Sequence, residues 1–292
     1  MTRCVTIRPL PEILGAEILN LDLSTPVSDF DFQCIKAALA DHQVLIFRDQ
    51  ESLTPDQQIA FSRRFGQLEI HIQHHFHLQG HPEILIVSNV VEDGKPLGLA
   101  DAGKYWHSDL SYLAEPSLGS LLHSKEWPAQ GGDTIFVNMV AAYDALPEEI
   151  KQQIDGLSAE HSYAARNKKQ QQITGALRPG LTAEQEARVP PVIHPIVRIH
   201  PDSGKRALFI SEGFTTKILG LPEEESAELL ALLFAHSTEE RFQYRHRWQP
   251  HDMVFWDNRQ TLHLATGCPA DLRRTLYRTT IRGDVPRGLA AA

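Results

Sequence analysis

The sequence lacks long apolar runs and an excess of basic residues. No apolar stretch in its 292 residues approaches the ~20 that a transmembrane helix needs, and the start, MTRCVTIRPLPEIL, has no apolar core typical of a signal peptide. The 28 basic residues are outnumbered by 37 acidic ones, giving a formal net charge of -9, whereas a nucleic-acid-binding protein needs a basic patch. We therefore expect a cytoplasmic protein with no membrane or nucleic-acid partner.

Cysteine is also scarce. Cys4, Cys34 and Cys268 lie far apart and form no CxxC pair, which argues against a thiolate zinc site. Histidine, in contrast, occurs 15 times and is a frequent metal ligand and proton carrier. Hydrophobic residues make up 42% of the chain, enough for a packed core, and no internal repeat or long linker divides it. We expect a single domain over residues 1–292 with its core at about 5–284.

Short apolar or alternating segments, bounded by Gly, Pro, Asp and Asn, outnumber the helix signals. The strongest helix signal is TPDQQIAFSRRFG, where Thr54 can cap the helix, Pro55 suits its first position and Gln57 completes a capping box. Many short strands without regular βα alternation favour a mainly β protein, a sandwich or jelly roll with flanking helices. Further helices are expected at residues 28–42, 144–157 and 222–237. Nine strands are expected at residues 43–48, 83–88, 118–124, 134–138, 195–200, 207–211, 241–248, 252–257 and 275–282.

One pattern of side chains suggests a metal site. His107 and Asp109 in YWHSDLSY lie two positions apart, so on a strand both side chains leave the same face. His263 in WDNRQTLH follows a predicted strand and an Asp-Asn-Arg turn. Two histidines and one carboxylate with open positions form the facial triad of non-haem Fe(II) oxygenases. An HxD spacing alone is more often an ordinary surface pair, so this hypothesis depends on the rest of the sequence.

The C-terminal segment LRRTLYRTTIRGD adds two candidate anion-binding groups. On a strand, Arg274 and Arg278 share a face about 13 Å apart, far enough to hold two separate anions. Guanidinium suits fork-like recognition of a carboxylate or sulfonate; the alternative is a solvated basic edge strand. Thr134, at the start of a strand after a glycine turn, can donate a hydroxyl hydrogen bond to a bound carboxylate.

These segments, taken in order, resemble the TauD/TfdA family of Fe(II)- and 2-oxoglutarate-dependent dioxygenases over nearly the whole chain. The resemblance extends through WHSD, GGDTIFVNMVAAYDALPEEI, HPIVRIHPDSGKRALFISEGFTTKI, FAHSTEERFQYRHRWQPHDMVFWDNRQTLH and the arginine-bearing tail. It implies a double-stranded β-helix (jelly roll) with catalytic iron bound by His107, Asp109 and His263. It also implies that O2 and 2-oxoglutarate are consumed to hydroxylate a small anionic sulfonate or carboxylate, releasing succinate and CO2, and that the protein is a homo-oligomer, a dimer or tetramer.

The resemblance also assigns the binding residues. Thr134 and Arg274 match positions that hold the distal carboxylate of 2-oxoglutarate. Positions that contact the substrate are matched by Arg278, His71, Tyr112 and Phe214. Two departures alter substrate contacts, because His74 replaces a pocket tyrosine and a pocket asparagine falls on or near Gly103. Iron and 2-oxoglutarate chemistry are therefore expected, whereas taurine is not carried over as the substrate.

Other interpretations of the same residues account for fewer of them. The histidine-rich segment 71–81 matches no common zinc-finger spacing, so a loop over the active site is favoured over a structural zinc site. The stretch 164–180 is lid-like. A metal-dependent hydrolase would use the same triad around zinc, but it has no need for Thr134 and Arg274. A non-catalytic jelly-roll anion-binding protein would leave three convergent metal ligands unexplained.

Overall fold

The computed structural model describes residues 5–71, 73–100, 103–174 and 181–289. The helices are α1 (Asp29–His42), α2 (Pro55–Arg63), α3 (Met139–Asp144), α4 (Glu148–Ile154), α5 (Tyr163–Thr174), α6 (Ala183–Arg188) and α7 (Glu223–Ser237), with short 3-10 turns η1 (His74–Phe76) and η3 (Glu240–Phe242). The strands are β1 (Thr6–Pro9), β2 (Ala16–Leu19), β3 (Val44–Phe47), β4 (Leu68–Glu69), β5 (His77–Leu78), β6 (His81–Ser88), β7 (Val91–Glu92), β8 (Lys95–Pro96), β9 (Ser117–Glu126), β10 (Thr134–Asn138), β11 (Ser158–His161), β12 (Val192–Pro195), β13 (Val197–Ile199), β14 (Arg206–Leu208), β15 (Thr215–Ile218), β16 (Gln243–His246), β17 (Met253–Asp257), β18 (Thr261–Ala265) and β19 (Thr275–Arg282).

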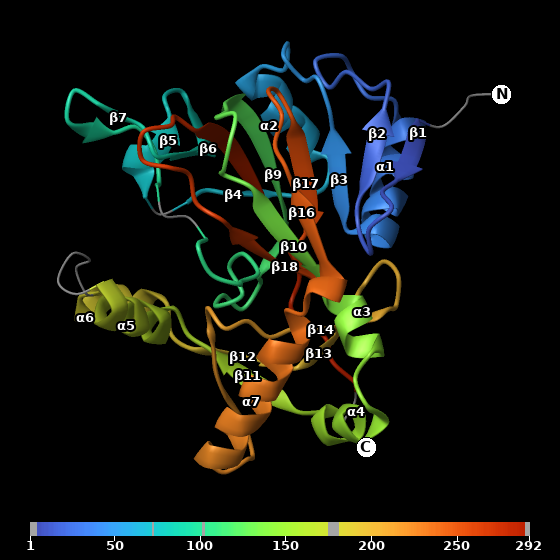
Figure 1. Ribbon diagram of the computed structural model, residues 1–292, viewed down its shortest axis with the longest axis vertical. Coiled ribbons are helices and arrows are strands. Elements are labelled where there is room, and N and C mark those ends of the chain that lie inside the picture. The colour runs from blue at the N-terminus through green and yellow to red at the C-terminus, as the bar shows by residue number, and fades with distance from the viewer. Residues whose placement is uncertain (1–4, 72, 101–102, 175–180, 290–292) are drawn as a thin grey trace.

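Two sheets face each other in the upper part of Figure 1 and form the jelly roll. The larger has nine strands in the order β1-β2-β3-β17-β9-β19-β6-β5, with β4 also paired to β19. The smaller has the order β16-β10-β18. Alternate residues of β3 divide between two cores: Val44 and Ile46 pack toward the small sheet, while Leu45 and Phe47 pack on the opposite face. The predicted fold class, mainly β with flanking helices, is confirmed.

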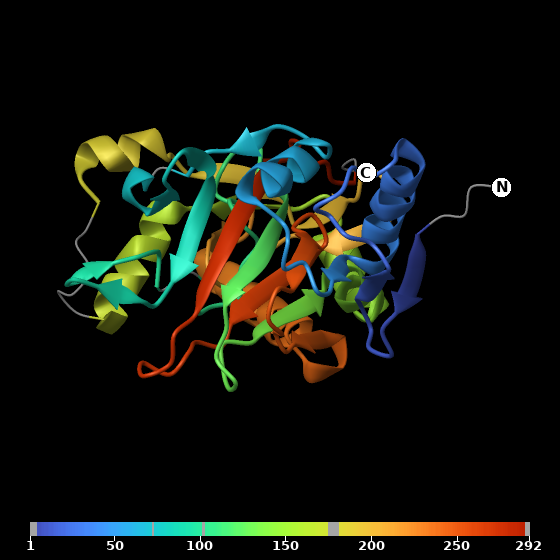
Figure 2. The ribbon, with the colours of Figure 1, turned by 90° about the horizontal axis from the view of Figure 1, so that it is seen from above.

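Helices α1 and α2 cover the outer face of the large sheet (Figure 2). Each begins at the residue that the sequence predicts. The Ser28 side chain accepts a hydrogen bond from the Asp31 backbone N–H at the start of α1. Thr54 and Gln57 form the expected capping box at the start of α2. These caps satisfy backbone groups that a helix start leaves unpaired.

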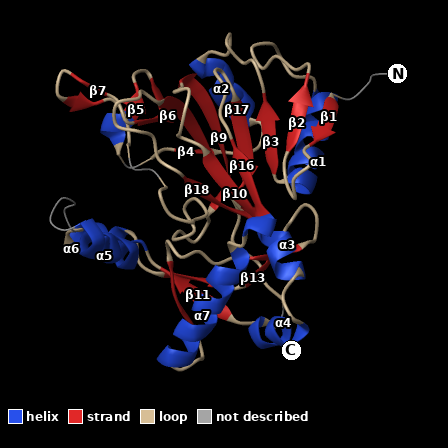
Figure 3. Ribbon diagram, viewed as in Figure 1, coloured by secondary structure: helices blue, strands red, loops and turns tan. Residues whose placement is uncertain are grey.

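The lower part of the molecule is a smaller α/β layer, shown by element type in Figure 3. Strand β11 pairs with β12 and β15, and β13 pairs with β14. Helices α3, α4 and α7 pack with these strands around a third apolar core. The predicted helix over 144–157 is wrong as a single element, because α3 ends at Asp144 and Pro147 caps a separate helix, α4. No described helix combines the length and apolarity needed to cross a membrane.

The segment 241–248 carries the predicted alternation but begins with a 3-10 turn rather than a strand. Phe242, Tyr244, His246 and Trp248 are all buried, whereas Arg245 is exposed. This face of β16 therefore points into the core between the two sheets. It brings an indole and an imidazole close to the start of β10, where Thr134 lies opposite His246.

Candidate active site

Three metal-ligand side chains converge between the two sheets. His263 lies in β18, and His107 pairs with it through two backbone hydrogen bonds of 3.1 and 2.9 Å. One ligand atom from each of these residues and from Asp109 lies within 4.8 Å of the other two. Asp109 Oδ1 is 3.6 Å from His107 Nε2 and 3.9 Å from His263 Nε2. Across the described ranges, no other group of three such side chains meets this closely.

The prediction that His107 and Asp109 share one strand is wrong. His107 forms an isolated β-bridge, and Asp109 begins a turn that continues through Leu110, whose φ is 58°. The two side chains converge because the bridge fixes His107 against His263 and because hydrogen bonds hold the turn. The three residues expected to converge do lie together, but through a local structure other than the expected strand.

Hydrogen bonds orient the ligand atoms of His107 and Asp109 toward the centre of the triad, whereas His263 Nδ1 is buried without a hydrogen-bond partner. The Ser120 hydroxyl, from β9 of the large sheet, donates to Asp109 Oδ2 over 2.8 Å, which leaves Oδ1 facing the histidines. His107 Nδ1 donates to the Tyr105 carbonyl over 2.8 Å, so Nε2 points inward. A ligating histidine is commonly oriented in this way by a bond from its other nitrogen. The donor set and its orientation fit a divalent metal such as Fe(II).

The turn between β17 and β18 supports the triad from behind. Asn258 Oδ1 accepts a hydrogen bond from the Asp109 backbone N–H over 3.2 Å, and Ser108 Oγ donates to the Asn258 carbonyl over 2.7 Å. Within the same turn, Arg259 donates to both carboxylate oxygens of Asp257 over 2.8 and 2.6 Å. The charges of Arg259 and Asp257 are buried together, and their pairing offsets the cost of removing each ion from water. The Asp-Asn-Arg motif thus supports the turn that carries Asp109, and none of its three residues belongs to the triad.

Electrostatics favour the protonation states that bind metal. Burial alone would raise the pKa of Asp109, but Arg278, 3.5 Å away, and the two histidines hold that pKa well below its usual range. Burial and the neighbouring His107 keep the pKa of His263 well below its ordinary value. A carboxylate and a neutral imidazole are the forms that coordinate a metal. No proton has to leave these two groups near neutral pH.

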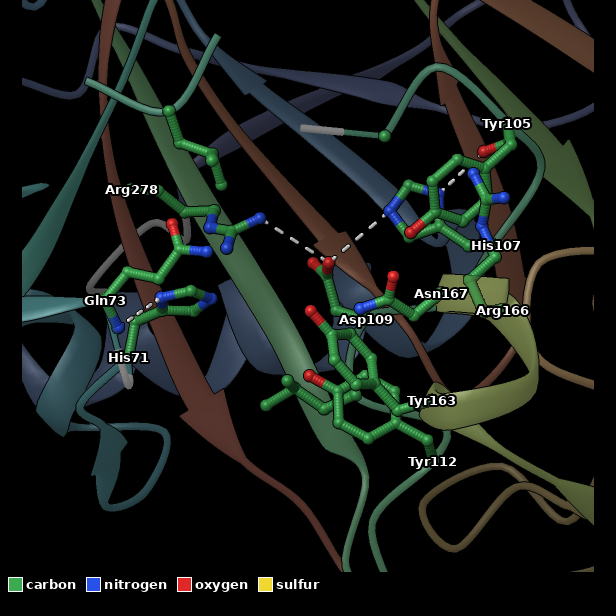
Figure 4. A pocket seen from close by; sticks show the side chains of 13 residues that line it. His71, Gln73, Tyr105, His107, Asp109, Tyr112, Tyr163, Arg166, Asn167 and Arg278 are labelled. Carbon is green, nitrogen blue, oxygen red and sulfur yellow. Dashed lines mark hydrogen bonds and ion pairs between the residues drawn. The ribbon is translucent and has the colours of Figure 1, made fainter. Parts of the chain in front are cut away.

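A cavity of about 110 Å³ opens beside the triad (Figure 4). Arg278 and His71 line it on one side, and the rings of Tyr105, Tyr112 and Tyr163 line it on others. Burial, followed by the charge of Arg278, lowers the pKa of His71 to about 4, so this imidazole is neutral near pH 7. Of these two neighbouring residues, Arg278 therefore carries the positive charge.

The predicted substrate residues do not all reach this cavity. Arg278, His71 and Tyr112 line it, but Phe214 does not. Phe214 is 4% exposed and packs behind the pocket, with its ring 4.9 Å from that of Tyr112. The substrate contact expected of Phe214 therefore stays a prediction, since its ring lies behind the residues that line this cavity. Its large apolar ring instead supports the tyrosine that lines the pocket.

Of the two departures from the family pattern, Gly103 lies at the cavity as expected and His74 does not. His74 is exposed in η1 and lies outside the cavity, which its neighbour Gln73 lines. Gly103 does line the cavity, and its φ is +81°. A Cβ at Gly103 would lie 2.5 Å from His107 Cε1, closer than side-chain atoms pack. Of the histidine-rich segment, His71 lines the cavity, which supports the interpretation of a loop over the active site.

Sequence reasoning missed the residues that α5 contributes. Tyr163, Arg166 and Asn167 line the cavity from this helix, and the Arg166 guanidinium lies 3.7 Å from the centre of the Tyr105 ring. The lid-like stretch therefore begins as a helix beside the pocket, while residues 175–180 lie outside the described part of the chain. The polar sequence of α5 has no apolar stripe that would have identified it.

Arg274 occupies a second polar site, separate from that of Arg278. A register shift between Thr275 and Leu276 interrupts the regular strand pattern, and Arg274 borders another cavity, of about 380 Å³. Its Nε is buried without a partner, and no carboxylate of the described residues lies within ion-pair distance. Burial lowers the pKa of Arg274 to about 10, so it remains a cation near pH 7. An unpaired buried guanidinium of this kind fits an anionic ligand.

Thr134 lies close to this second site at the start of β10. Its side chain is buried, 3% exposed, and its Oγ1 accepts a hydrogen bond from Trp248 Nε1 over 3.1 Å. Gly132, two residues earlier, lies beside the Arg274 side chain, because a Cβ on it would be 3.1 Å from Arg274 Cδ. A hydroxyl donor and a guanidinium thus lie near each other at one end of the jelly roll.

Comparisons with known proteins agree with this geometry. The family described as taurine catabolism dioxygenase TauD, TfdA family matches residues 6–280. An alpha-ketoglutarate-dependent 2,4-dichlorophenoxyacetate dioxygenase of Cupriavidus pinatubonensis is 37% identical over 96% of this chain and 98% of its own length. An alpha-ketoglutarate-dependent sulfate ester dioxygenase of Pseudomonas putida is 31% identical over 97% of this chain and 91% of its own length. A solved structure of AAD-2 with Mn(II) and N-oxalylglycine has a TM-score of 0.81 at 32% identity and covers 98% of this chain and 99% of that one.

Proposed function

The chain belongs to the taurine catabolism dioxygenase TauD, TfdA family, and from that premise we propose which residues hold the metal, the cosubstrate and the substrate. It is an Fe(II)- and 2-oxoglutarate-dependent dioxygenase that hydroxylates a small anionic substrate with release of succinate and CO2. The observation that carries the residue assignment is the convergence of one carboxylate and two imidazoles beside a pocket that holds a cation. A cytoplasmic location, a single domain and a homo-oligomeric assembly stay predictions from the sequence.

His107, Asp109 and His263 are the proposed iron ligands. When bound there, Fe(II) activates O2 for hydroxylation, coupled to decarboxylation of 2-oxoglutarate. The protein's own contribution is to hold three donor atoms on one side so that the remaining positions stay open for cosubstrate and oxygen. Ser120 and the Tyr105 carbonyl supply that orientation.

Arg274 and Thr134 are the proposed anchors for the distal carboxylate of 2-oxoglutarate. The guanidinium offers an unpaired buried N–H, and the hydroxyl lies nearby with one lone pair already occupied. A carboxylate there would satisfy groups that are costly to leave unpaired. The bond to this carboxylate orients the cosubstrate; it takes no part in the oxidation itself.

Arg278 and His71 are the proposed anchors for the acidic group of the substrate, and Tyr112 is a proposed contact for its body. The relatives' names include a phenoxyacetate and a sulfate ester. Three tyrosine rings line this cavity, and aromatic rings pack well in offset or edge-to-face contact with another ring. We therefore place an aryl or aryloxy carboxylate first among the small acids that this site would hydroxylate, ahead of alkyl sulfonates.

Anaerobic addition of Fe(II) and 2-oxoglutarate tests the proposal. We expect a weak visible charge-transfer band and, on admission of O2 with an aryloxyacetate, succinate release coupled to substrate loss. Taurine, alkyl sulfates and alkyl sulfonates belong in the same screen. A metal-dependent hydrolase or a non-catalytic anion-binding protein would give neither the band nor succinate, so their absence would contradict the proposal.

A further inference from the structure

Two tryptophans connect the proposed anchors of 2-oxoglutarate. The Arg274 guanidinium lies 5.1 Å from the centre of the Trp127 ring. Trp248 donates from Nε1 to Thr134 Oγ1 over 3.1 Å. The two indole rings pack against each other with centroids 5.5 Å apart and planes at 35°. A continuous set of contacts therefore runs from one anchor to the other through the tryptophan pair, Trp127 and Trp248.

The indole N–H of Trp248 restricts the direction in which Thr134 can donate. Both side chains are buried, at 5% and 3% exposure. A hydroxyl has one hydrogen to donate and two lone pairs that accept, and Trp248 occupies one of those lone pairs. Within the described part of the chain, the side-chain hydrogen bond of the Thr134 hydroxyl is this one, in which it accepts. Its own hydrogen is therefore available to a carboxylate.

Trp248 is itself held in place by a buried polar network. The His246 ring packs edge-on against it, with centroids 4.8 Å apart and planes at 88°. His246 Nε2 lies 3.2 Å from Asp252 Oδ2, and the Tyr244 hydroxyl lies 2.9 Å from His246 Nδ1. A ring fixed from behind in this way keeps its N–H aimed in one direction, which is what a pre-organised binding site requires.

The absence of a side chain at Gly132 leaves space for Arg274, the second proposed anchor. A Cβ on this residue would lie 2.7 Å from Trp127 Cη2 and 3.1 Å from Arg274 Cδ. Its φ of +74° is also a conformation that favours glycine. The close approach of backbone, indole and guanidinium keeps Arg274 against Trp127, so both anchors depend on the same pair of rings.

We propose that Trp248 is a positioning residue for 2-oxoglutarate. Its N–H holds the Thr134 hydroxyl as a donor to the distal carboxylate, and its ring, through Trp127, supports Arg274. The inference rests on the proposed function, since it takes Thr134 and Arg274 as the carboxylate anchors. Because Trp248 acts through Thr134, its loss should weaken the cosubstrate and leave the metal ligands unaffected.

Trp248→Phe tests the role of the indole N–H apart from that of the ring, because phenylalanine keeps an aromatic side chain and lacks the donor. Isothermal titration of N-oxalylglycine into Mn(II)-loaded protein measures cosubstrate-site affinity without turnover. We expect the dissociation constant to rise about 3- to 10-fold, the effect of losing one buried hydrogen bond, with the Mn(II) affinity unchanged. In a Thr134→Val background, Trp248→Phe should weaken binding by less than about twofold, because the hydroxyl that it positions is already gone.

Tyr143→Phe is the matched control, because it removes the hydroxyl of another buried aromatic side chain, which accepts a hydrogen bond from Arg206 and belongs to neither Thr134 nor the network behind Trp248. It should lower the melting temperature and leave N-oxalylglycine affinity unchanged. Wild-type affinity in Trp248→Phe, or an equal loss in both Thr134 backgrounds, would overturn the inference while leaving the proposed function intact. Failure of the wild-type Mn(II) protein to bind N-oxalylglycine would instead contradict the proposed function.

A second measurement needs no tryptophan variant. The chain has four tryptophans, so ¹⁵N-indole spectra of the Zn(II)-loaded protein contain four signals at most. We expect the signal that shifts most in Thr134→Val to shift also when N-oxalylglycine is added to the wild-type protein. An indole signal that responds to Thr134→Val but not to N-oxalylglycine would overturn the inference.

Discussion

The metal side and the substrate side of this active site are built differently. The metal side, the triad with the groups that orient it, comes from β9, β18 and two tight turns, and side-chain or backbone hydrogen bonds fix His107 and Asp109. The substrate side, the cavity residues contributed by α5 and by the loop after His71, has several buried polar atoms without a hydrogen-bond partner. Among the described residues, Gln73 Oε1, Arg166 Nε and Asn167 Oδ1 are buried without a hydrogen-bond partner.

This difference suggests that separate parts of the site determine the reaction and the choice of substrate. Buried polar groups without partners are costly, so those facing a binding cavity are poised to accept a partner from a ligand. In the triad, His263 Nδ1 alone is in this state. We infer that the chemistry of this enzyme depends on the sheet and its turns, whereas the choice of substrate depends on α5 and the loop after His71.

The largest expected effect lies on the metal side. His107→Ala or Asp109→Ala should reduce succinate production at least about 10³-fold, because two ligands no longer define the open positions of the iron. Coupled succinate assays at saturating Fe(II) and 2-oxoglutarate measure this. His75→Ala, an exposed histidine outside the cavity, is the control and should retain wild-type turnover; substantial succinate release by either ligand variant would remove the basis of the comparison.

The two arginines should divide between cosubstrate and substrate. Arg278→Ala should raise the KM for substrate about 10- to 100-fold and change that for 2-oxoglutarate little, and Arg274→Ala should do the reverse. This range corresponds to losing a charge-assisted hydrogen bond of roughly 1.5–3 kcal/mol. Arg282→Ala, at the end of the same strand and paired with Glu69 on the surface, should change neither constant. Equal effects of both arginine variants on both constants would show that the sites are not separate.

Low pH should destabilise the fold next to α5, where the buried side chain of His161 lies. His161, 1% exposed, precedes α5 by two residues, and burial lowers its pKa to about 3. The unfolded chain, with a histidine pKa near 6.5, binds the proton more readily between about pH 6.5 and pH 3. This contribution to stability is complete above pH 6.5 and is lost as the pH falls through that window.

Denaturant unfolding at pH 7.5 and pH 5.0 measures this loss. His161 should contribute about 2 kcal/mol to the decrease in the free energy of unfolding, from about 1.4 kcal/mol per pH unit below 6.5. His161→Gln should therefore show a decrease that is smaller by about that amount, provided that both proteins unfold in one cooperative step. The same pH dependence in both proteins would rule out His161 as its source.

The smallest expected effect is on substrate choice. Arg166→Gln should change kcat/KM by about 3- to 10-fold in opposite directions for different acids, because a cation that approaches the pocket is exchanged for a neutral amide. The KM for 2-oxoglutarate should stay the same. Lys169→Gln, on the exposed part of α5, is the control. A uniform decrease for every substrate, or a changed 2-oxoglutarate KM, would mean that α5 is not confined to the substrate side.

The sequence predicted strands best where a short, mainly apolar segment lies between turn residues. The residues expected for β10 and β19 are those of the structure, 134–138 and 275–282. All five residues of β10 are buried, and a short apolar run between turn residues is typical of such a strand. Strand β18 was missed, although it carries the proposed metal ligand His263, because it follows its turn closely and spans five residues. Helix α5 was missed because its polar residues give no period at all.

The site was predicted through residue types more than through geometry. The HxD spacing and His263 identified the triad, but their convergence depends on a backbone bridge between segments far apart in the chain, which no local pattern encodes. The packing of Phe214 behind Tyr112 and the stacking of Arg166 on Tyr105 are likewise tertiary contacts. Pattern and resemblance named the ligands; the residues that surround and orient them followed from packing alone.

The close approach of Gly103 to His107 limits how this enzyme can be redesigned. Any side chain added at that position would push on an imidazole before it touched a substrate. An attempt to graft an amide there, to recover a contact with an amino-bearing acid, would therefore change iron affinity at the same time. Directed evolution toward such compounds has an easier route through Gln73 and Asn167, where new contacts leave the ring untouched.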